Sequence, residues 1–350
     1  MSWKKKYLEK AFSEMDKKNS LYQSTSFWEG ACRKISKKIS AKGLSDFRNG
    51  IDNLHFFVPT YGFPGNSFSQ DRMQGILELF PKDTSKKNFL ALEKYLNGEL
   101  LALADYKVFK AANKATDVLD LLKFSESSFG NPLEQFEIEG RNFSRSSINY
   151  LLGLSYLKSI FPEFVPKTVL EIGGGFGTLG EILNQIPNQE IKYIDIDLPP
   201  IFLIAAEYIR NACLLAEGEY MLSDLDDSGD VIDISELPLF SFLPSWEIEN
   251  LRGKIDLFVN FISFQEMEPD VVRNYLRVVS SLDAEIILLR NMKEGKQKAT
   301  KSEVGVKIPV VNDDYATFLP NYTLVATNTI PFGYTTVDNF NSELLIFKKK

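Results

Sequence analysis

Four glycines in one short stretch could bring the backbone close to a ligand. The stretch 168–183 opens with an apolar run from Val169 to Ile172, has glycine at positions 173, 174, 175 and 177, and continues with apolar residues at helical spacing. Glycine has no Cβ, so the backbone can turn sharply and approach a bound molecule. The helix that follows would offer N–H groups without intrahelical partners and a partial positive charge. The stretch therefore predicts a strand, a ligand-binding turn and a helix, the start of a Rossmann-like unit.

The glycines fit two spacing patterns. Gly173, Gly175 and Gly177, preceded by Glu171, match the acidic-x-Gly-x-Gly-x-Gly pattern of class I S-adenosylmethionine-dependent methyltransferases. Glycines 175, 177 and 180 also match the dinucleotide fingerprint. The first pattern is favoured because its opening glycine follows directly on the strand and Glu171 can lie near the amino group of the cofactor's methionine part. A glycine-rich turn without a ligand is the remaining alternative.

Acidic residues follow the second predicted strand, residues 191–196. In an open α/β sheet a ligand lies beyond the carboxyl ends of the strands, so residues that follow different strands should converge. Asp197 stands about 20 residues after Gly177, the distance expected of an acid that binds ribose hydroxyls. Asp195 alternates with it and is the second choice, and Leu198 follows. An Asp that only caps the next helix is the structural alternative.

Two more polar positions complete the predicted cofactor site. Asp224 follows the short strand predicted at 219–222 and suits an adenine amino group, whereas Asn260 lies at the end of the apolar strand 255–261. An acidic run follows Asp224, but its spacing fits no EF-hand, so a solvated loop is preferred to a cation site and no metal is predicted. The predicted cofactor-binding residues are Glu171, Gly173, Gly175, Gly177, Asp197, Leu198, Asp224 and Asn260.

The predicted catalytic residues are Glu266, Gln265 and His55. An alcohol loses its proton when it is methylated, and a positioned base helps by roughly 10²–10⁴-fold. Glu266 is the first candidate for that base, and Gln265 could orient the hydroxyl or the cofactor. Glu266 could instead be a charge placed at a helix N-terminus. His55 is the only histidine in the chain, and it could reach the site from an N-terminal loop rich in aromatic residues.

The elements that must position these residues form two regions. Residues 1–155 are mainly helical, with helices predicted at 7–18, 26–41, 89–109 and 111–124, and would cap the site and shape the substrate pocket. Residues 156–350 alternate five strands with helices, pass through a polar loop at 293–307, and end in two strands at 322–328 and 343–347. The fold class predicted is α/β, a Rossmann-like seven-stranded class I methyltransferase sheet with an N-terminal mainly helical domain.

Composition limits the classes of partner. The chain has 350 residues, 44% of them hydrophobic, and a net charge of −7, which argues against a nucleic-acid backbone as the main partner. The two cysteines, Cys32 and Cys213, imply neither a disulfide framework nor a metal motif. No signal peptide and no membrane span are predicted, which points to a cytoplasmic protein.

Three stretches resemble one family. Residues 169–177, 193–199 and 256–267, together with Gly130-Asn131-Pro132 and the C-terminal stretch 340–347, are similar to the sugar O-methyltransferase family of bacterial surface-polysaccharide loci. The resemblance covers about residues 125–350. The Asp-Leu-Pro stretch at 197–199 is also similar to plant-type small-molecule O-methyltransferases. Those enzymes carry a catalytic His-Asp pair where this chain has Phe264 and Gln265, which puts their histidine-base mechanism in doubt here.

The resemblance implies an S-adenosylmethionine-dependent O-methyltransferase that acts on a hydroxyl of a nucleotide-linked or glycan-attached sugar in surface polysaccharide biosynthesis. The alternatives are methylation of another small-molecule oxygen or nitrogen, an NAD-dependent oxidoreductase, and a non-catalytic cofactor-binding protein. The expected partner is the sugar substrate. The sequence leaves the oligomeric state open, a homo-oligomer included.

Overall fold

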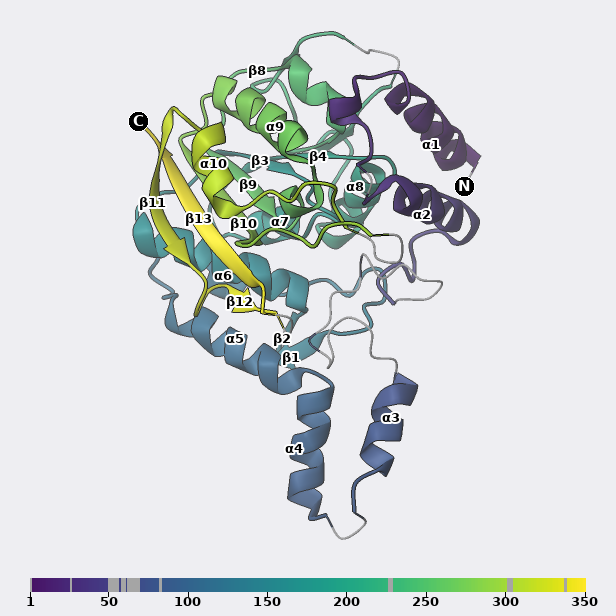
Figure 1. The fold of residues 1–350 in the computed structure, drawn as a ribbon, viewed down its shortest axis with the longest axis vertical. Helices are drawn as coiled ribbons and strands as arrows, with labels where there is room; N and C mark the ends of the chain where they lie inside the picture. The colour runs from purple at the N-terminus through teal and green to yellow at the C-terminus, as the bar shows by residue number, and fades with distance from the viewer. Residues whose placement is uncertain are drawn as a thin grey trace.

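A mainly helical region precedes the sheet in this chain. The computed structural model describes residues 2–25, 27–49, 57, 61, 70–81, 84–225, 229–300, 305–336 and 339–350. In the first part of the chain it has five α-helices among these residues: α1 (Ser2–Met15), α2 (Glu29–Lys42), α3 (Gln70–Glu78), α4 (Lys86–Leu96) and α5 (Glu99–Ala111). Figure 1 shows α3 and α4 extending away from the rest of the molecule. A short hairpin of β1 (Phe136–Ile138) and β2 (Arg141–Phe143) then leads into α6 (Arg145–Ile160).

The main sheet of the described residues has nine strands. Its order is β11-β13-β10-β9-β3-β4-β7-β5, with β12 paired to β13. The six strands from β10 to β5 run parallel, and β13 lies antiparallel between β10 and β11. The strands are β3 (Thr168–Ile172), β4 (Lys192–Asp197), β5 (Tyr220–Leu222), β7 (Phe240–Pro244), β9 (Leu257–Phe261), β10 (Ile286–Met292), β11 (Tyr322–Asn328), β12 (Tyr334–Thr335) and β13 (Asn341–Lys349).

This architecture confirms the predicted fold class, an α/β Rossmann-like methyltransferase sheet with an N-terminal helical region, but the sheet has nine strands where seven were predicted, since β7 and the short β12 were not expected. The helices between the strands are α7 (Thr178–Asn184), α8 (Ile201–Ala212), α9 (Pro269–Ser281) and α10 (Asn312–Phe318). The remaining short elements are η1 (Ser20–Tyr22), η4 (Leu121–Lys123), η5 (Ser245–Asn250), η6 (Phe264–Glu266) and a two-stranded pair of β6 (Ile232–Asp233) and β8 (Leu251–Arg252).

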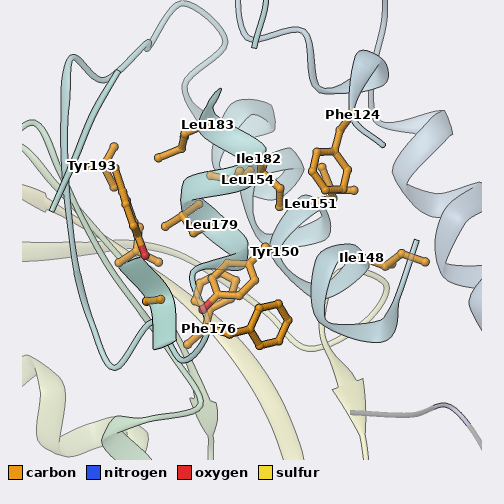
Figure 2. Close-up of a cluster of buried hydrophobic side chains, with 14 of the residues drawn as sticks. Phe124, Ile148, Tyr150, Leu151, Leu154, Phe176, Leu179, Ile182, Leu183 and Tyr193 are labelled. Carbon is orange, nitrogen blue, oxygen red and sulfur yellow. The ribbon is translucent and has the colours of Figure 1, made fainter. Parts of the chain in front are cut away.

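Successive side chains of the central strands feed two cores, one on each face of the sheet. In β10, Ile286 and Leu288 belong to one buried cluster, while Ile287 and Leu289 belong to the other. This follows from the two-residue period of a strand, and it explains why these strands are apolar without alternation. The first core includes α6 and α7, and Figure 2 shows their side chains interleaved with Tyr193 of the sheet. The second core includes α9 and α10.

Three elements differ from the sequence prediction. The strand β7 was not predicted. It lies beside β4, in the place expected for the third predicted strand, β5, which lies instead beyond β7 at the edge of the sheet. The helix predicted at 89–109 is broken between α4 and α5, where Gly98 has a left-handed φ of 84°. The helix predicted at 111–124 is wrong, because only the short η4 is helical after Ala112.

The predicted boundary between residues 155 and 156 falls inside α6. This helix contacts α5 on one side and α7 and β10 on the other. The division into two domains stays a prediction. Among the helices described, none is long and apolar enough to cross a membrane.

Candidate functional site

A cavity of about 510 Å³ lies at the carboxyl ends of β3, β4, β7 and β9. β3 is the first strand of the parallel sheet; the chain continues from it to β4 on one side and later returns to β9 on its other side, so the cavity lies at the switch point where open α/β sheets bind ligands. Residues that follow each strand line it, as do α6, the loop after β10 and the segment before α2. They include Phe27, Trp28, Arg145, Asn149, Tyr150, Gly173, Gly175, Asp197, Leu198, Ser245, Phe261, Ser263, Glu266, Tyr275, Lys296 and Tyr334.

The glycine turn has the backbone that its spacing predicts. Gly173, Gly175 and Gly177 have φ of 72°, 65° and 91°, in the left-handed region that favours glycine. A Cβ on Gly173 would lie 2.0 Å from the Ser263 Oγ, whereas a Cβ on Gly175 would meet nothing within 4 Å. Gly175 therefore leaves open space on the cavity wall, where a ligand could approach the backbone.

Asp197 lies at this wall and Asp195 does not. Asp197 ends β4, lines the cavity, and accepts hydrogen bonds from the backbone N–H of Gly175 (3.2 Å) and of Leu198 (2.7 Å). Each carboxylate oxygen keeps a further lone pair for a ligand hydroxyl. Asp195 points into the interior, with no exposed surface and no hydrogen-bond partner for either oxygen among the described residues.

Glu171 lies in the interior, beneath the turn. Its carboxylate accepts hydrogen bonds from the hydroxyls of Tyr150 (2.7 Å) and Tyr193 (2.6 Å), two residues labelled in Figure 2. Burial raises the pKa of Glu171 to about 7, and the two hydroxyls oppose that shift. Burial also raises the pKa of Asp197 to about 7, and burial with the charges of Asp197 and Glu171 raises the pKa of Asp195. The turn thus rests on two buried carboxyl groups, Glu171 and Asp195, and on the partly buried Asp197, which lines the cavity.

Two further predicted residues hold the strand ends together and do not line the cavity. The Asn260 amide donates to the Ile172 carbonyl (2.8 Å) and accepts from the Phe264 N–H (3.1 Å). Gln265 is buried, and its side chain accepts from the Met292 N–H (2.8 Å). Both contacts position the turns after β3 and β9.

Glu266 does line the cavity, with both carboxylate oxygens engaged. The Trp28 indole donates to one oxygen (3.0 Å), and the Lys296 ammonium forms an ion pair with the other (2.6 Å). The Thr25 hydroxyl donates to the Glu266 carbonyl (3.0 Å). Glu266 therefore joins the segment before α2 to the loop after β10 at the cavity wall.

The structure does not bring Asp224 to the cavity. Asp224 follows β5, and β7 separates β5 from β4, so Ser245 after β7 lines the cavity in its place. Residues 239–243 form a mostly apolar run between Pro238 and Pro244, a signal for a buried strand that was available in the sequence. His55 lies outside the described residues. No group of three or more potential metal ligands from His, Cys, Asp and Glu occurs in the described part of the chain.

Aromatic and arginine side chains that the sequence did not single out form the other end of the cavity. Arg145, at the first position of α6, lines it with its guanidinium 5.0 Å from the ring centre of Tyr334 and 5.6 Å from that of Tyr61. Tyr150 stacks on Phe261 at 4.7 Å between the two ends. We refer to the turn 173–177 with Asp197 as the glycine end, and to Arg145, Tyr334 and Phe261 as the arginine end. The three residues of the arginine end come from distant positions in the chain, so no local sequence motif marked it.

Arg290 stands behind the arginine end. It is fully buried in β10, and its guanidinium donates to the carbonyl oxygens of Asn149 (2.6 Å) and Phe332. Its guanidinium lies 5.5 Å from the ring centre of Phe261 and 5.7 Å from that of Tyr334. Arg290 thus fixes the first turns of α6 against the loop before β12. Asp197 and Arg290 lie on strands three places apart, a separation of roughly 14 Å.

Comparisons with known proteins bear on the fold alone. No protein-family model matches the sequence, and no curated protein matches it significantly. The chain is similar to the magnesium protoporphyrin IX methyltransferase of Synechocystis, with 10% identity, a TM-score of 0.38, and coverage of 59% of this chain and 81% of that chain. It is similar to the 1,6-didemethyltoxoflavin-N1-methyltransferase of Burkholderia thailandensis, with 14% identity, a TM-score of 0.38, and coverage of 57% and 76%. These scores are low, and the fold assignment rests on the strand order and pairing.

Proposed function

We propose that the chain is an S-adenosylmethionine-dependent methyltransferase. The observation that carries the proposal is the glycine end: three alternate glycines with left-handed φ form the turn at the switch point, and Gly173 and Gly175 of this turn line the cavity beside Asp197 at the end of the next strand. The open space over Gly175 and the remaining lone pairs of Asp197 fit a ligand that needs close backbone approach and a carboxylate for its ribose hydroxyls.

The residues of the cavity would hold the reactants as follows. Asp197 would accept both ribose hydroxyls, and Leu198 would pack beside the nucleoside. When bound, S-adenosylmethionine would supply an electrophilic methyl group to the acceptor atom and would be released as S-adenosylhomocysteine. Glu266 is the carboxylate of the cavity that would take the proton of an alcohol, and it forms an ion pair with Lys296.

For the acceptor, we propose a sugar hydroxyl and hence O-methylation. The sequence resemblance to sugar O-methyltransferases supports this choice. The cavity adds aromatic side chains suited to a sugar face, namely Phe27, Trp28, Tyr275 and Tyr334, together with the polar side chains of Asn149 and Ser263. A role in surface polysaccharide biosynthesis rests on the resemblance alone.

Calorimetric titration with S-adenosylhomocysteine and, in parallel, with NAD(H) tests the cofactor. We expect micromolar binding of S-adenosylhomocysteine, about −8 kcal/mol, and no binding of NAD(H). Asp197→Ala should weaken S-adenosylhomocysteine at least tenfold. Asp233→Ala, at an exposed acid distant from the cavity, is the control and should bind like the wild type. Unchanged affinity in Asp197→Ala would remove Asp197 as the ribose ligand.

A dinucleotide is the second candidate ligand because of Gly180. A Cβ on this glycine of α7 would lie 2.8 Å from the Tyr193 ring, which is the close helix–strand packing that the third fingerprint glycine provides. The antiparallel β13 between β10 and β11 differs from an all-parallel dinucleotide-binding sheet. Binding of NAD(H) alone would replace the methyltransferase proposal with an oxidoreductase, and binding of neither would favour a non-catalytic protein.

A further inference from the structure

The glycine turn has a single side chain by which the rest of the molecule can hold it. Positions 173, 174, 175 and 177 are glycine, so Phe176 supplies the one side chain of the run 173–177. Its ring lines the cavity, is 5% exposed and is labelled in Figure 2. A glycine loses more conformational freedom on folding than any other residue. The residues that pack on the Phe176 ring therefore help to decide how firmly the turn keeps its shape.

Arg48 packs on this ring from the N-terminal region. Its guanidinium carbon lies 4.6 Å from the centre of the Phe176 ring and 5.6 Å from that of Tyr208. The Tyr208 ring meets the Phe176 ring edge-on, with 4.9 Å between their centres. A planar guanidinium can stack on an aromatic face while its edge donates hydrogen bonds, which a compact ammonium cannot do in the same way. Arg48 and Tyr208 therefore both restrain the Phe176 ring.

Buried partners fix the edge of the Arg48 guanidinium. It forms an ion pair with the Glu126 carboxylate (2.5 Å), and it donates to the Ser127 carbonyl (3.2 Å) and to the Tyr208 hydroxyl (3.4 Å). Arg48 is 2% exposed, and Glu126 is buried as well. Removing one partner of a buried ion pair is strongly destabilising, because the other charge stays behind uncompensated. The position of the guanidinium is thus set by groups other than the Phe176 ring.

The same network reaches three helices near the turn. The Ser144 hydroxyl, at the N-cap of α6, donates to Glu126 (2.7 Å). The Tyr208 hydroxyl of α8 donates to Glu181 (2.7 Å) of α7, the helix that begins directly after the turn. The other carboxylate oxygen of Glu181 accepts from the Ser127 N–H (2.6 Å). Arg48 therefore joins a segment of the N-terminal region to α6, α7 and α8.

We propose that Arg48 is a positioning residue of the cofactor site: its guanidinium holds the Phe176 ring, and through this ring the glycine turn, in the shape that binds S-adenosylmethionine. The inference rests on the proposed methyltransferase function, because it assigns the glycine end to that cofactor. Arg48 is not among the described residues that line the cavity, so it acts through Phe176 and not through a contact with the ligand. The N-terminal region thereby takes part in cofactor binding.

The test is calorimetric titration of the full-length protein and its Arg48 variants with S-adenosylhomocysteine. Arg48→Met removes the charge and the planar group and should weaken binding at least tenfold. Arg48→Lys keeps a charge beside Glu126 without the planar group. In urea unfolding it should recover most of the stability that Arg48→Met loses, but it should still bind at least fivefold more weakly than the wild type. Recovery of stability without recovery of affinity separates positioning from a structural role.

Lys158→Met is the matched control for the loss of a buried cation. Lys158 is a buried residue of α6 that forms an ion pair with Asp117, and it is not among the described residues that line the cavity. Its removal should lower stability for the same physical reason as the removal of Arg48. We expect Lys158→Met to bind S-adenosylhomocysteine within twofold of the wild type.

A double-mutant cycle with Phe176→Leu tests the route through the ring. Phe176→Leu alone should weaken S-adenosylhomocysteine at least fivefold, because leucine offers no aromatic face to the guanidinium. Arg48→Met should then weaken it by less than a further twofold. An effect of Arg48 that does not pass through the ring would be the same with Phe176 and with leucine at this position. If Arg48→Met does not fold, Arg48→Lys takes its place in the cycle.

Three results would overturn the inference: wild-type affinity in either folded Arg48 variant, an equal loss of affinity in Lys158→Met, or additive effects of the Arg48 and Phe176 substitutions. Failure of the proposed function looks different, because the wild type itself would then not bind S-adenosylhomocysteine. If the wild type bound NAD(H) instead, the same cycle would be measured with NAD(H) at the same turn. Binding of neither ligand would overturn the inference together with the proposed function.

Discussion

The two ends of the cavity contrast in charge and in construction. The glycine end, the turn 173–177 with Asp197, comes from two short runs of the chain, and the carboxyl groups of Glu171 and Asp195 lie beneath it. The arginine end is assembled from single residues of α6, β9, β10 and β12 and is cationic and aromatic. A backbone turn needs particular residues at consecutive positions, whereas a side-chain cluster needs only that several elements meet. The contrast suits two ligand parts of different chemistry.

The largest effect that we expect concerns Glu266, which lines the same cavity. Glu266→Gln should lower kcat by roughly 10²–10⁴-fold, because the amide cannot take a proton, while S-adenosylhomocysteine affinity stays within threefold. The measurement is steady-state kinetics with whichever acceptor supports turnover. Lys296→Met is the companion variant. It keeps the carboxylate and removes its ion pair, together with the contact of the ammonium with the Phe27 ring, so it should reduce kcat by less than about tenfold.

Wild-type turnover in Glu266→Gln would mean that this carboxylate only joins the segment before α2 to the loop after β10. Loss of S-adenosylhomocysteine binding in both variants would point the same way, since each removes a contact of that junction.

A second prediction separates backbone strain from crowding at the glycine end. Gly173→Ala should destabilise the protein by about 3 kcal/mol, since the left-handed φ costs about 1–2 kcal/mol and the contact with Ser263 adds about 1–3 kcal/mol. Gly140→Ala is the matched control: its φ is 74°, but no atom lies within 4 Å of its Cβ position, so only the first cost applies. Urea unfolding measures both. Equal costs would show that the turn can move away from Ser263.

The smallest effect is the pH dependence of cofactor binding. The pKa of Asp197 is about 7, raised mainly by burial and also by Glu266, so the carboxylate is mostly protonated at pH 6 and mostly ionised at pH 8. If the ionised form accepts the ribose hydroxyls, S-adenosylhomocysteine affinity should rise roughly tenfold from pH 6 to pH 8. Asp197→Asn should bind weakly at both values. A pH dependence that persists in Asp197→Asn would assign it to another group, such as Glu171 or Asp195.

The stability of the protein without ligand should change in the opposite direction. Glu171 and Asp197 have folded-state pKa values of about 7, above their unfolded values, so the folded state binds more protons between about pH 4 and pH 7. Stability should therefore fall as pH rises through that range. Calorimetric unfolding from pH 5 to pH 8 checks this, and a rise in stability over the range would contradict the burial of these acids.

Much of the glycine end could be predicted from the sequence, and several roles within it could not. The glycine spacing and Asp197 follow from a strand, a tight turn and the position of the next strand end. Glu171, Asn260 and Gln265 occupy the expected positions along the chain, but their side chains point into the interior and hold the turns. Asp224 was predicted to reach the cavity because it follows β5, which was expected beside β4. In the structure β7 lies between β4 and β5, so Asp224 does not reach the cavity.

The sequence by itself determined the class of the sheet, the glycine turn and the choice of Asp197. Each depends on local rules: apolar runs make buried strands, positive φ needs glycine, and the carboxyl ends of parallel strands share one edge. The tertiary structure alone decided the direction of each acid, the pairing of Glu266 with Trp28 and Lys296, and the gathering of Arg145, Arg290 and Tyr334. Those outcomes depend on which elements pack together, because a side chain gains its partner only when a distant segment of the chain arrives beside it.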